Sequence, residues 1–339
     1  MELLKQTLEA IKPADENAKR KAAERLDNLA KPIGALGVLE EIVIKMAGIT
    51  GKPHNKIEKR NVVVMCGDNG VVEEGVSACP QIFTKILTEN LGKGATGISV
   101  LSKTANADIT PVDIGVNAEI DSPKIINKKV MYGTKNMTKG PAMTREEAIK
   151  AIEVGIEIAD KLYGESYDIL GTGEMGIGNT TTSAAVLSAF SGLSPEITCG
   201  KGAGLTDDKY KSKIDAVVKA LEVNKPNKED PLDVISKVEI IHPIINKYGI
   251  GIQDGSTEEM LDMIKRANSI GKGIYGMKPL GGGHLISKAE ECFNFVREIP
   301  YIHSIAIGMQ SRDEVDADVN LMEYGYIPDE IKAKLKKID

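Results

Sequence analysis

The chain has 339 residues, of which 42% are hydrophobic and 27% are charged, and 43 Lys and Arg against 49 Asp and Glu leave a net charge of −6. This acidic balance excludes the basic surface that nucleic-acid binding usually requires, and no stretch approaches the roughly 18 uninterrupted apolar residues of a membrane helix. The length allows about two domains, or one large α/β domain with a satellite. The 34 glycines and the absence of Trp favour a small-molecule enzyme rich in tight turns.

Residues 1–50 are predicted to be helical. The chain begins with a charged amphipathic segment, MELLKQTLEAIK, and not with the basic and apolar regions of a signal peptide. A second apolar pattern at helical spacing covers residues 36–49 and follows the Lys-Pro-Ile-Gly break at 31–34. We therefore expect a small helical region and a cytoplasmic protein.

Three short β-branched runs follow, near 61–66, 108–114 and 167–171, and each is predicted to be a buried strand. Amphipathic helices separate them, including 144–164, where Thr144 and Glu147 form a capping-box pattern. Alternating strands and helices predict an α/β fold with a parallel sheet and ligands at the carboxyl ends of its strands. The stretch of about 25 residues after the second strand is polar and is predicted to cross the surface.

The overall prediction is a parallel-sheet, Rossmann-like three-layer domain with a helical N-terminal small domain and an atypical α/β tail. The expected boundaries are 1–50 for the helical region, 51–237 for the α/β domain and 238–339 for the tail. The tail contains three strand-like runs, at 238–246, 273–283 and 302–309, with helices between them.

Cysteine and histidine spacing gives no metal or disulfide signal. The four cysteines (66, 79, 199 and 292) lack CxxC pairs and are interpreted as reduced small hydrophobic residues, and the four histidines stand near no partner at metal-ligand spacing. We expect no metal and no cofactor.

Residues 173–182, GEMGIGNTTT, are the most informative segment for function. They lie between a predicted strand and a helix of small residues, where backbone N–H groups at a helix N-terminus attract phosphate and glycines let it approach. No Gly-Lys-Ser/Thr follows, so this is not a Walker loop, and Glu174 would repel a pyrophosphate. A carboxylate beside a phosphate site suits a sugar phosphate, although an ordinary glycine-rich turn remains the alternative.

This segment, together with 25–40 (RLDNLAKPIGALGVLE), 66–81 (CGDNGVVEEGVSACPQ), 111–116 (PVDIGV) and 200–208 (GKGAGLTDD), resembles the nicotinate-nucleotide:dimethylbenzimidazole phosphoribosyltransferases of cobamide biosynthesis. The resemblance covers residues 1–237. It implies transfer of phosphoribosyl from nicotinate mononucleotide to 5,6-dimethylbenzimidazole or a related base, with no nucleic-acid or membrane partner. A homodimer is also expected.

The resemblance also implies a set of substrate-binding residues. The phosphoribosyl group would be held by the loop and helix start, with Glu174 near the ribose and Lys213 supplying positive charge, while two residues after the first strand would serve the aromatic acceptor. The implied set is Gly176, Gly178, Asn179, Thr180, Thr181, Glu174 and Lys213, with Ser77 and Gln81 on the acceptor side. Asn69, Cys79 and Ala35 depart from the family pattern and leave the acceptor open.

The tail departs from this family. Its catalytic glutamate belongs to a late LGEGTGA-like motif that does not occur between Val238 and Asp339, so no residue here inherits the role of general base. The tail instead resembles the last β/α units of an aldo-keto reductase, with residues 308–312 matching a nucleotide-phosphate corner. Three hypotheses follow: a phosphoribosyltransferase with impaired turnover, a non-catalytic nucleotide or aromatic binder, and an NADPH-dependent reductase fragment.

Overall fold

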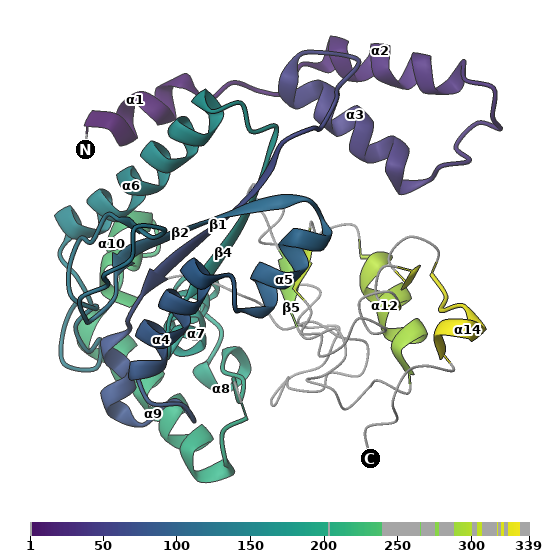
Figure 1. Cartoon of the computed structure of the whole chain (residues 1–339). Helices are drawn as coiled ribbons and strands as arrows, with labels where there is room; N and C mark the ends of the chain where they lie inside the picture. The colour runs from purple at the N-terminus through teal and green to yellow at the C-terminus, as the bar shows by residue number, and fades with distance from the viewer. Residues whose placement is uncertain are drawn as a thin grey trace.

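The computed structural model describes residues 2–202 and 204–238, and in the tail residues 265, 275–277, 288–299, 304–306, 317, 320–321 and 325–332. Its centre is a parallel sheet in the order β3-β2-β1-β4. The strands are β1 (Arg60–Gly67), β2 (Ala107–Gly115), β3 (Ile126–Asn127) and β4 (Ile169–Met175). The three predicted strands are therefore confirmed, and they share one sheet (Figure 1). The prediction that all three are buried is wrong for β4, whose residues are exposed or half-buried because β4 is the last strand of the sheet within the described residues.

Helices pack around this sheet and beside its ends. Before β2 they are α1 (Glu2–Ala10), α2 (Glu16–Asp27), α3 (Val38–Thr50), the 3-10 turn η1 (Gly70–Glu74), α4 (Ile82–Lys93) and α5 (Gly97–Thr104). After β3 they are α6 (Arg145–Gly164), α7 (Asn179–Ser191), α8 (Pro195–Thr198), α9 (Asp207–Asn224) and α10 (Pro231–Val238). The α2–α3 hairpin projects from one end of the sheet (Figure 1). None of the helices in the described ranges has the length and apolar character that a membrane span requires.

The strand sequences explain the two layers of core. Side chains alternate between the two faces of a strand, so Val63 packs with the α6 residues Val154 and Ile158 while Val64 packs on the other face with Leu91 of α4. The apolar residues of α6 recur every four positions, which keeps them on one side of the helix. Thr144 and Glu147 form the predicted capping box at its start.

A third core cluster joins α7 and α9 behind the glycine-rich loop. Ala184 and Ala185 of α7 pack against Ala216 and Val217 of α9, and the small side chains let the two helices approach closely. This packing fixes the direction in which the N-terminus of α7 points, and that terminus is where the predicted phosphate loop ends.

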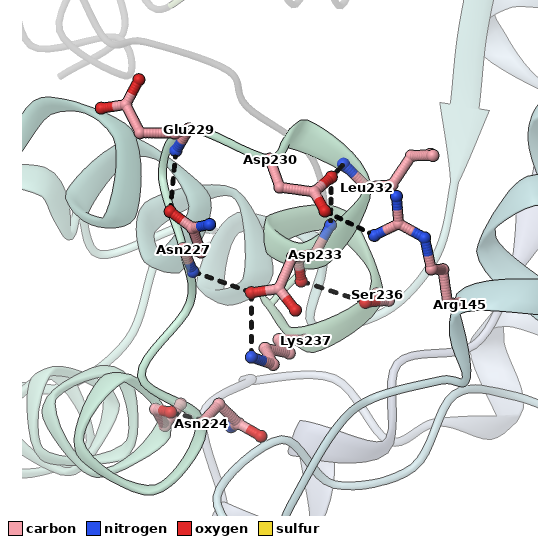
Figure 2. A network of polar contacts seen from close by, with 10 residues as sticks. Arg145, Asn224, Asn227, Glu229, Asp230, Leu232, Asp233, Ser236 and Lys237 are labelled. Atoms are coloured by element: carbon pink, nitrogen blue, oxygen red, sulfur yellow. Dashed lines mark hydrogen bonds and ion pairs between the residues drawn. The ribbon is translucent and has the colours of Figure 1, made fainter.

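Helix α10 is fixed to the start of α6 by a polar network (Figure 2). The Asp230 carboxylate accepts from the backbone N–H groups of Leu232 and Asp233, which caps α10, and it pairs with Arg145 at 2.7 Å. Asp233 also pairs with Lys237 at 2.8 Å. These contacts anchor the last described helix before the tail.

The stretch after β2 differs in part from its prediction as a polar surface crossing. It contains β3, and two of its side chains, Met137 and Ala142, are almost fully buried in the cluster that includes α7 and α9. The backbone N–H of Met143 donates to the Ser236 carbonyl of α10 at 2.9 Å. The segment therefore joins the sheet edge to the α7–α10 layer.

In the tail, β5 (Tyr275–Met277) and β6 (Ser304–Ala306) form a parallel pair, and α12 (Ala289–Arg297) and α14 (Asp329–Lys332) are helical. These strands coincide with two of the three strand-like runs predicted there. The run at 239–246, the expected helix at 256–270 apart from residue 265, and the reductase-like corner at 308–312 lie outside the described residues.

Candidate functional site

The glycine-rich loop lies between the carboxyl end of β4 and the start of α7. Strand β4 extends to Met175, so Glu174, which was predicted in the loop, is the penultimate residue of the strand and pairs with Met65 of β1. Gly178 caps α7 with a φ of 89°, a left-handed conformation that favours glycine. The carboxyl ends of β1 and β4 thus place residues 67–70 beside residues 175–179.

Close backbone approach explains why glycine is needed at position 176. A Cβ atom there would overlap the carbonyl oxygen of Gly67 and lie 2.9 Å from Nδ2 of Asn69. Between the glycines, Ile177 is held at both of its backbone polar groups: its N–H donates to Thr84 Oγ1 at 3.0 Å, and its carbonyl accepts from Asn69 Nδ2 at 3.0 Å. The loop is therefore fixed by Asn69, which follows β1, and by Thr84 of α4.

Glu174 faces the start of α7, where its carboxylate accepts a hydrogen bond from Asn179 Nδ2. Desolvation by the surrounding protein raises the pKa of Glu174, and the Asn179 hydrogen bond opposes this shift. Glu174 is nevertheless exposed to solvent on one side, although protein surrounds it on the others. A carboxylate in this position can accept hydrogen bonds from hydroxyl groups of a ligand.

Lys213 of α9 lies directly beneath the first turn of α7. Its side chain is completely buried, and Nζ donates to Thr180 Oγ1 at 2.8 Å and to the Gly200 carbonyl at 2.7 Å. The 200–202 turn closes over this contact, since a Cβ at Gly202 would lie 2.9 Å from Thr180 Oγ1. The predicted cation is therefore placed next to the predicted phosphate loop.

Two predicted binding residues are less available to a ligand than the sequence suggested. The N–H groups of Asn179 and Thr181 already donate to the carbonyls of Gly176 and Gly178, so part of the anion-binding capacity of this helix end is used within the turn. The Thr181 side chain is fully buried, and its hydroxyl has no hydrogen bond to the described residues.

The two acceptor-side residues, Ser77 and Gln81, lie in the segment between η1 and α4. Ser77 Oγ accepts a local hydrogen bond from the Cys79 N–H, which shapes the turn. Gln81 is the N-cap of α4, and its side chain lies beside the carboxylate of Asp68 at the end of β1. In the described structure, Gln81 is thus linked to the strand ends, whereas no recorded contact brings Ser77 to the glycine-rich loop.

Sequence reasoning did not assign roles to Asp68, Asn69 and Thr84, which hold these segments together. The first two directly follow β1, and that position at the carboxyl end of a central parallel strand was a usable signal. Thr84 carried none, because its role depends on where α4 packs.

A separate pocket of about 930 Å³ lies over α6 and residues 127–129, lined by side chains of both charges. None of its lining residues belongs to the loops that follow β1, β2 and β4, so we assign the candidate site to the ends of those strands, where charge and backbone geometry converge. In the described ranges, no group of three His, Cys, Asp or Glu side chains is placed to hold a metal ion.

Replacing Gly176 by Ala is expected to destabilise the protein by about 1–3 kcal/mol, because the added methyl group forces the ends of β1 and β4 apart. Urea unfolding measures the change. Gly173→Ala on the same strand is the matched control, since its Cβ would make ordinary contacts of 3.5 Å or more. Equal stability of the two variants would contradict the close approach at Gly176.

Comparison with known proteins shows the family to which the chain belongs. A family model described as Phosphoribosyltransferase matches residues 11–239. The nicotinate-nucleotide--dimethylbenzimidazole phosphoribosyltransferase of Clostridium tetani (strain Massachusetts / E88) is 58% identical over 238 residues, which are 70% of this chain and 66% of that protein. The enzyme of the same name from Ruminiclostridium cellulolyticum is 52% identical over 233 residues, 69% of this chain and 66% of that protein.

The crystal structure of CobT from Thermus thermophilus superposes with a TM-score of 0.64 at 32% identity, covering 85% of this chain and 81% of that one. This chain spans 66% of the length of the two curated relatives. The family model, these two relatives and the CobT structure give no support to the resemblance of the tail to an aldo-keto reductase. From the match over 11–239 and the shared α/β architecture, the chain belongs to the nicotinate-nucleotide--dimethylbenzimidazole phosphoribosyltransferase family.

Proposed function

We propose that this chain transfers the phosphoribosyl group of nicotinate mononucleotide to 5,6-dimethylbenzimidazole or a related aromatic base, a step of cobamide biosynthesis. The observation that carries the proposal is the grouping of Glu174, the 176–180 loop and the buried Lys213 at the carboxyl ends of the parallel strands. Family membership over residues 11–239 supports the same reaction.

The chemistry needs few groups from the protein. The pyridinium nitrogen of nicotinate mononucleotide carries a positive charge, so it accepts the electrons of the C1′–N bond when nicotinate leaves. The bond can therefore break without a general acid, and positive charge develops at C1′ of the ribose. The unprotonated ring nitrogen of the incoming benzimidazole then forms the new bond to C1′, and the proton on its other ring nitrogen must pass to an acceptor. The site must therefore hold the phosphate, stabilise the ribose and orient the aromatic base.

The residues divide between these tasks. The phosphoribosyl group would be surrounded by Gly176, Gly178, Asn179, Thr180 and Thr181. The Lys213 ammonium, which contacts Thr180, favours binding of the negatively charged phosphate. Glu174 would accept hydrogen bonds from ribose hydroxyls, in competition with Asn179.

On the acceptor side, Ser77 precedes α4 and Gln81 is its N-cap residue. We assign both residues to the aromatic base. Gln81 lies near both Asp68 and the helix whose Thr84 holds Ile177, which supports its place beside the phosphoribosyl loop.

A non-catalytic nucleotide or aromatic binder is the second candidate. It is favoured by the lack of an LGEGTGA-like glutamate motif between residues 238 and 339. Release of nicotinate in the presence of 5,6-dimethylbenzimidazole separates the two, because a binder releases none.

Replacing Glu174 by Ala is expected to weaken nicotinate mononucleotide binding about tenfold or more, since a hydrogen bond to a charged group is worth about 1.5–3 kcal/mol. Titration calorimetry measures the affinity, and Glu222→Ala, at an exposed position of α9, is the matched control. Unchanged affinity in Glu174→Ala would overturn the assignment of Glu174 to the ribose.

We also infer a homodimer that acts in the cytoplasm. Apolar side chains of α3, among them Leu39, Ile42 and Ile49, are 48–71% exposed, and such a face is commonly covered by a partner surface. All four cysteines are free, as expected of a reducing compartment. The division of the chain at residues 50/51 and 237/238 stays a prediction.

A further inference from the structure

Asp68 is a buried carboxylate at the end of β1 that the proposed reaction leaves without a role. Asp68 is only 4% exposed to solvent. The backbone on either side is fixed, because the Asp68 N–H donates to the Gly115 carbonyl and the Thr134 N–H donates to the Asp68 carbonyl, both at 2.9 Å. The backbone of Asp68 is therefore held between the end of β2 and the segment that follows β3.

The two carboxylate oxygens have different surroundings. Oδ2 accepts from the Asn117 N–H at 2.8 Å, whereas Oδ1 is buried and has no hydrogen bond within 3.5 Å to the described residues. Burial raises the pKa of Asp68, and the side chains of Thr84 and Gln81, which approach from α4, oppose this shift together with the Asn117 N–H. The remaining acceptor capacity of Asp68 thus faces the start of α4.

Thr84 connects this carboxylate to the glycine-rich loop. It is completely buried, and its oxygen accepts the Ile177 N–H at 3.0 Å, which leaves the hydroxyl hydrogen free to point toward an acceptor such as Asp68. Asn69, the next residue after Asp68, holds the Ile177 carbonyl. Both backbone groups of Ile177 therefore depend on the position of residues 68–69 and of α4.

We propose that Asp68 is a positioning residue that fixes the acceptor side of the site, at Gln81, relative to the phosphoribosyl loop, at Ile177. The inference rests on the proposed function for the identity of the two substrates. Group transfer requires the incoming ring nitrogen and C1′ to meet in a narrow range of distance and angle, so a small displacement between these segments lowers the rate.

The contact itself is tested without substrate. Amide hydrogen exchange of the ligand-free protein is followed at Ile177 in the wild type, Asp68→Asn, Thr84→Val and Thr88→Val. Thr88 is the matched control, because it is equally buried on the same helix but its hydroxyl donates to the Thr84 carbonyl. We expect exchange at Ile177 to be about tenfold faster in Thr84→Val, because this variant removes the oxygen that accepts the Ile177 N–H. We expect a similar increase in Asp68→Asn, because this variant changes the buried carboxylate that Thr84 approaches, and no change in Thr88→Val.

Steady-state kinetics then test the consequence for the site. In Asp68→Asn we expect KM to rise for both the aromatic base and nicotinate mononucleotide, and kcat/KM to fall about tenfold or more. The double variant Asp68→Asn/Thr84→Val is expected to be no slower than the worse single variant, because both changes break one connection. Thermal melting of each variant separates this local effect from a general loss of stability.

Unchanged exchange at Ile177 in Asp68→Asn, or additive kinetic losses in the double variant, would overturn the positioning role. An inactive wild type that binds no nicotinate mononucleotide would instead overturn the proposed function, and hydrogen exchange would still decide whether Asp68 fixes the two segments.

Discussion

Replacing Lys129 by Met is expected to destabilise the protein by about 3–5 kcal/mol, because the change leaves the buried Asp113 carboxylate without its cation. The two side chains are 9% and 1% exposed, and Lys129 Nζ lies 2.9 Å from Asp113 Oδ2. The same ammonium donates to the Ala118 carbonyl at 3.0 Å, so it also holds the segment that follows β2.

Urea unfolding of Lys129→Met measures this loss. Lys128→Met is the matched control, since Lys128 pairs with Glu157 on the surface and exposed pairs contribute about 0–1 kcal/mol. Adding Asp113→Asn to Lys129→Met removes the unpaired charge and is expected to restore part of the stability. Equal effects of the two single lysine variants would show that the Asp113 charge is compensated elsewhere.

The main strands and the glycine-rich loop could be predicted because each is encoded by a short, continuous stretch of sequence. The β-branched run that forms β1 specifies a strand buried on both faces, and the glycines at 176 and 178 meet a close approach and a positive φ. The end of β4 could not be placed, since pairing with β1 continues the strand through Gly173 and Glu174 into the predicted loop.

The contacts that position the site depend on packing and left little local signal. Lys129 stands in a stretch that reads as a polar surface segment, yet its charge is buried against Asp113 of β2. Thr84 resembles any helical threonine until α4 packs against β1 and β4 and brings its hydroxyl to Ile177. Partners separated by many residues in sequence require the sheet order, which no single segment specifies.

The contribution of Lys213 was predicted from resemblance, and the structure supplies a physical reason for its position. An ammonium group beneath α7 adds positive charge to a helix end whose N–H groups at Asn179 and Thr181 are partly used within the turn. In the proposed site, electrostatic attraction for the phosphate would therefore depend more on this lysine than the sequence alone indicates.

Turnover by the 339-residue chain is expected to be about 10²–10⁴-fold slower than that of the Clostridium tetani relative, because a general base within hydrogen-bond reach contributes about that factor. Residues 238–339 contain no LGEGTGA-like motif, whereas the predicted phosphate-binding groups all lie in the matching part of the chain. Nicotinate mononucleotide binding should therefore persist while product forms slowly. Calorimetric affinity and nicotinate release, measured for both proteins at one pH, separate binding from turnover.

Equal turnover of the two proteins would contradict this expectation and would require another proton acceptor in this chain. Glu174 is the first group to test, since its raised pKa favours proton uptake and its carboxylate lies at the loop where C1′ would be held. If Glu174→Gln then retained substrate affinity but lost turnover, the carboxylate would be the base. If both proteins were fast and Glu174→Gln left kcat unchanged, another residue would have to accept the proton. The ribose-binding role of Glu174 would still stand, because amide and carboxylate oxygens both accept hydrogen bonds from hydroxyl groups.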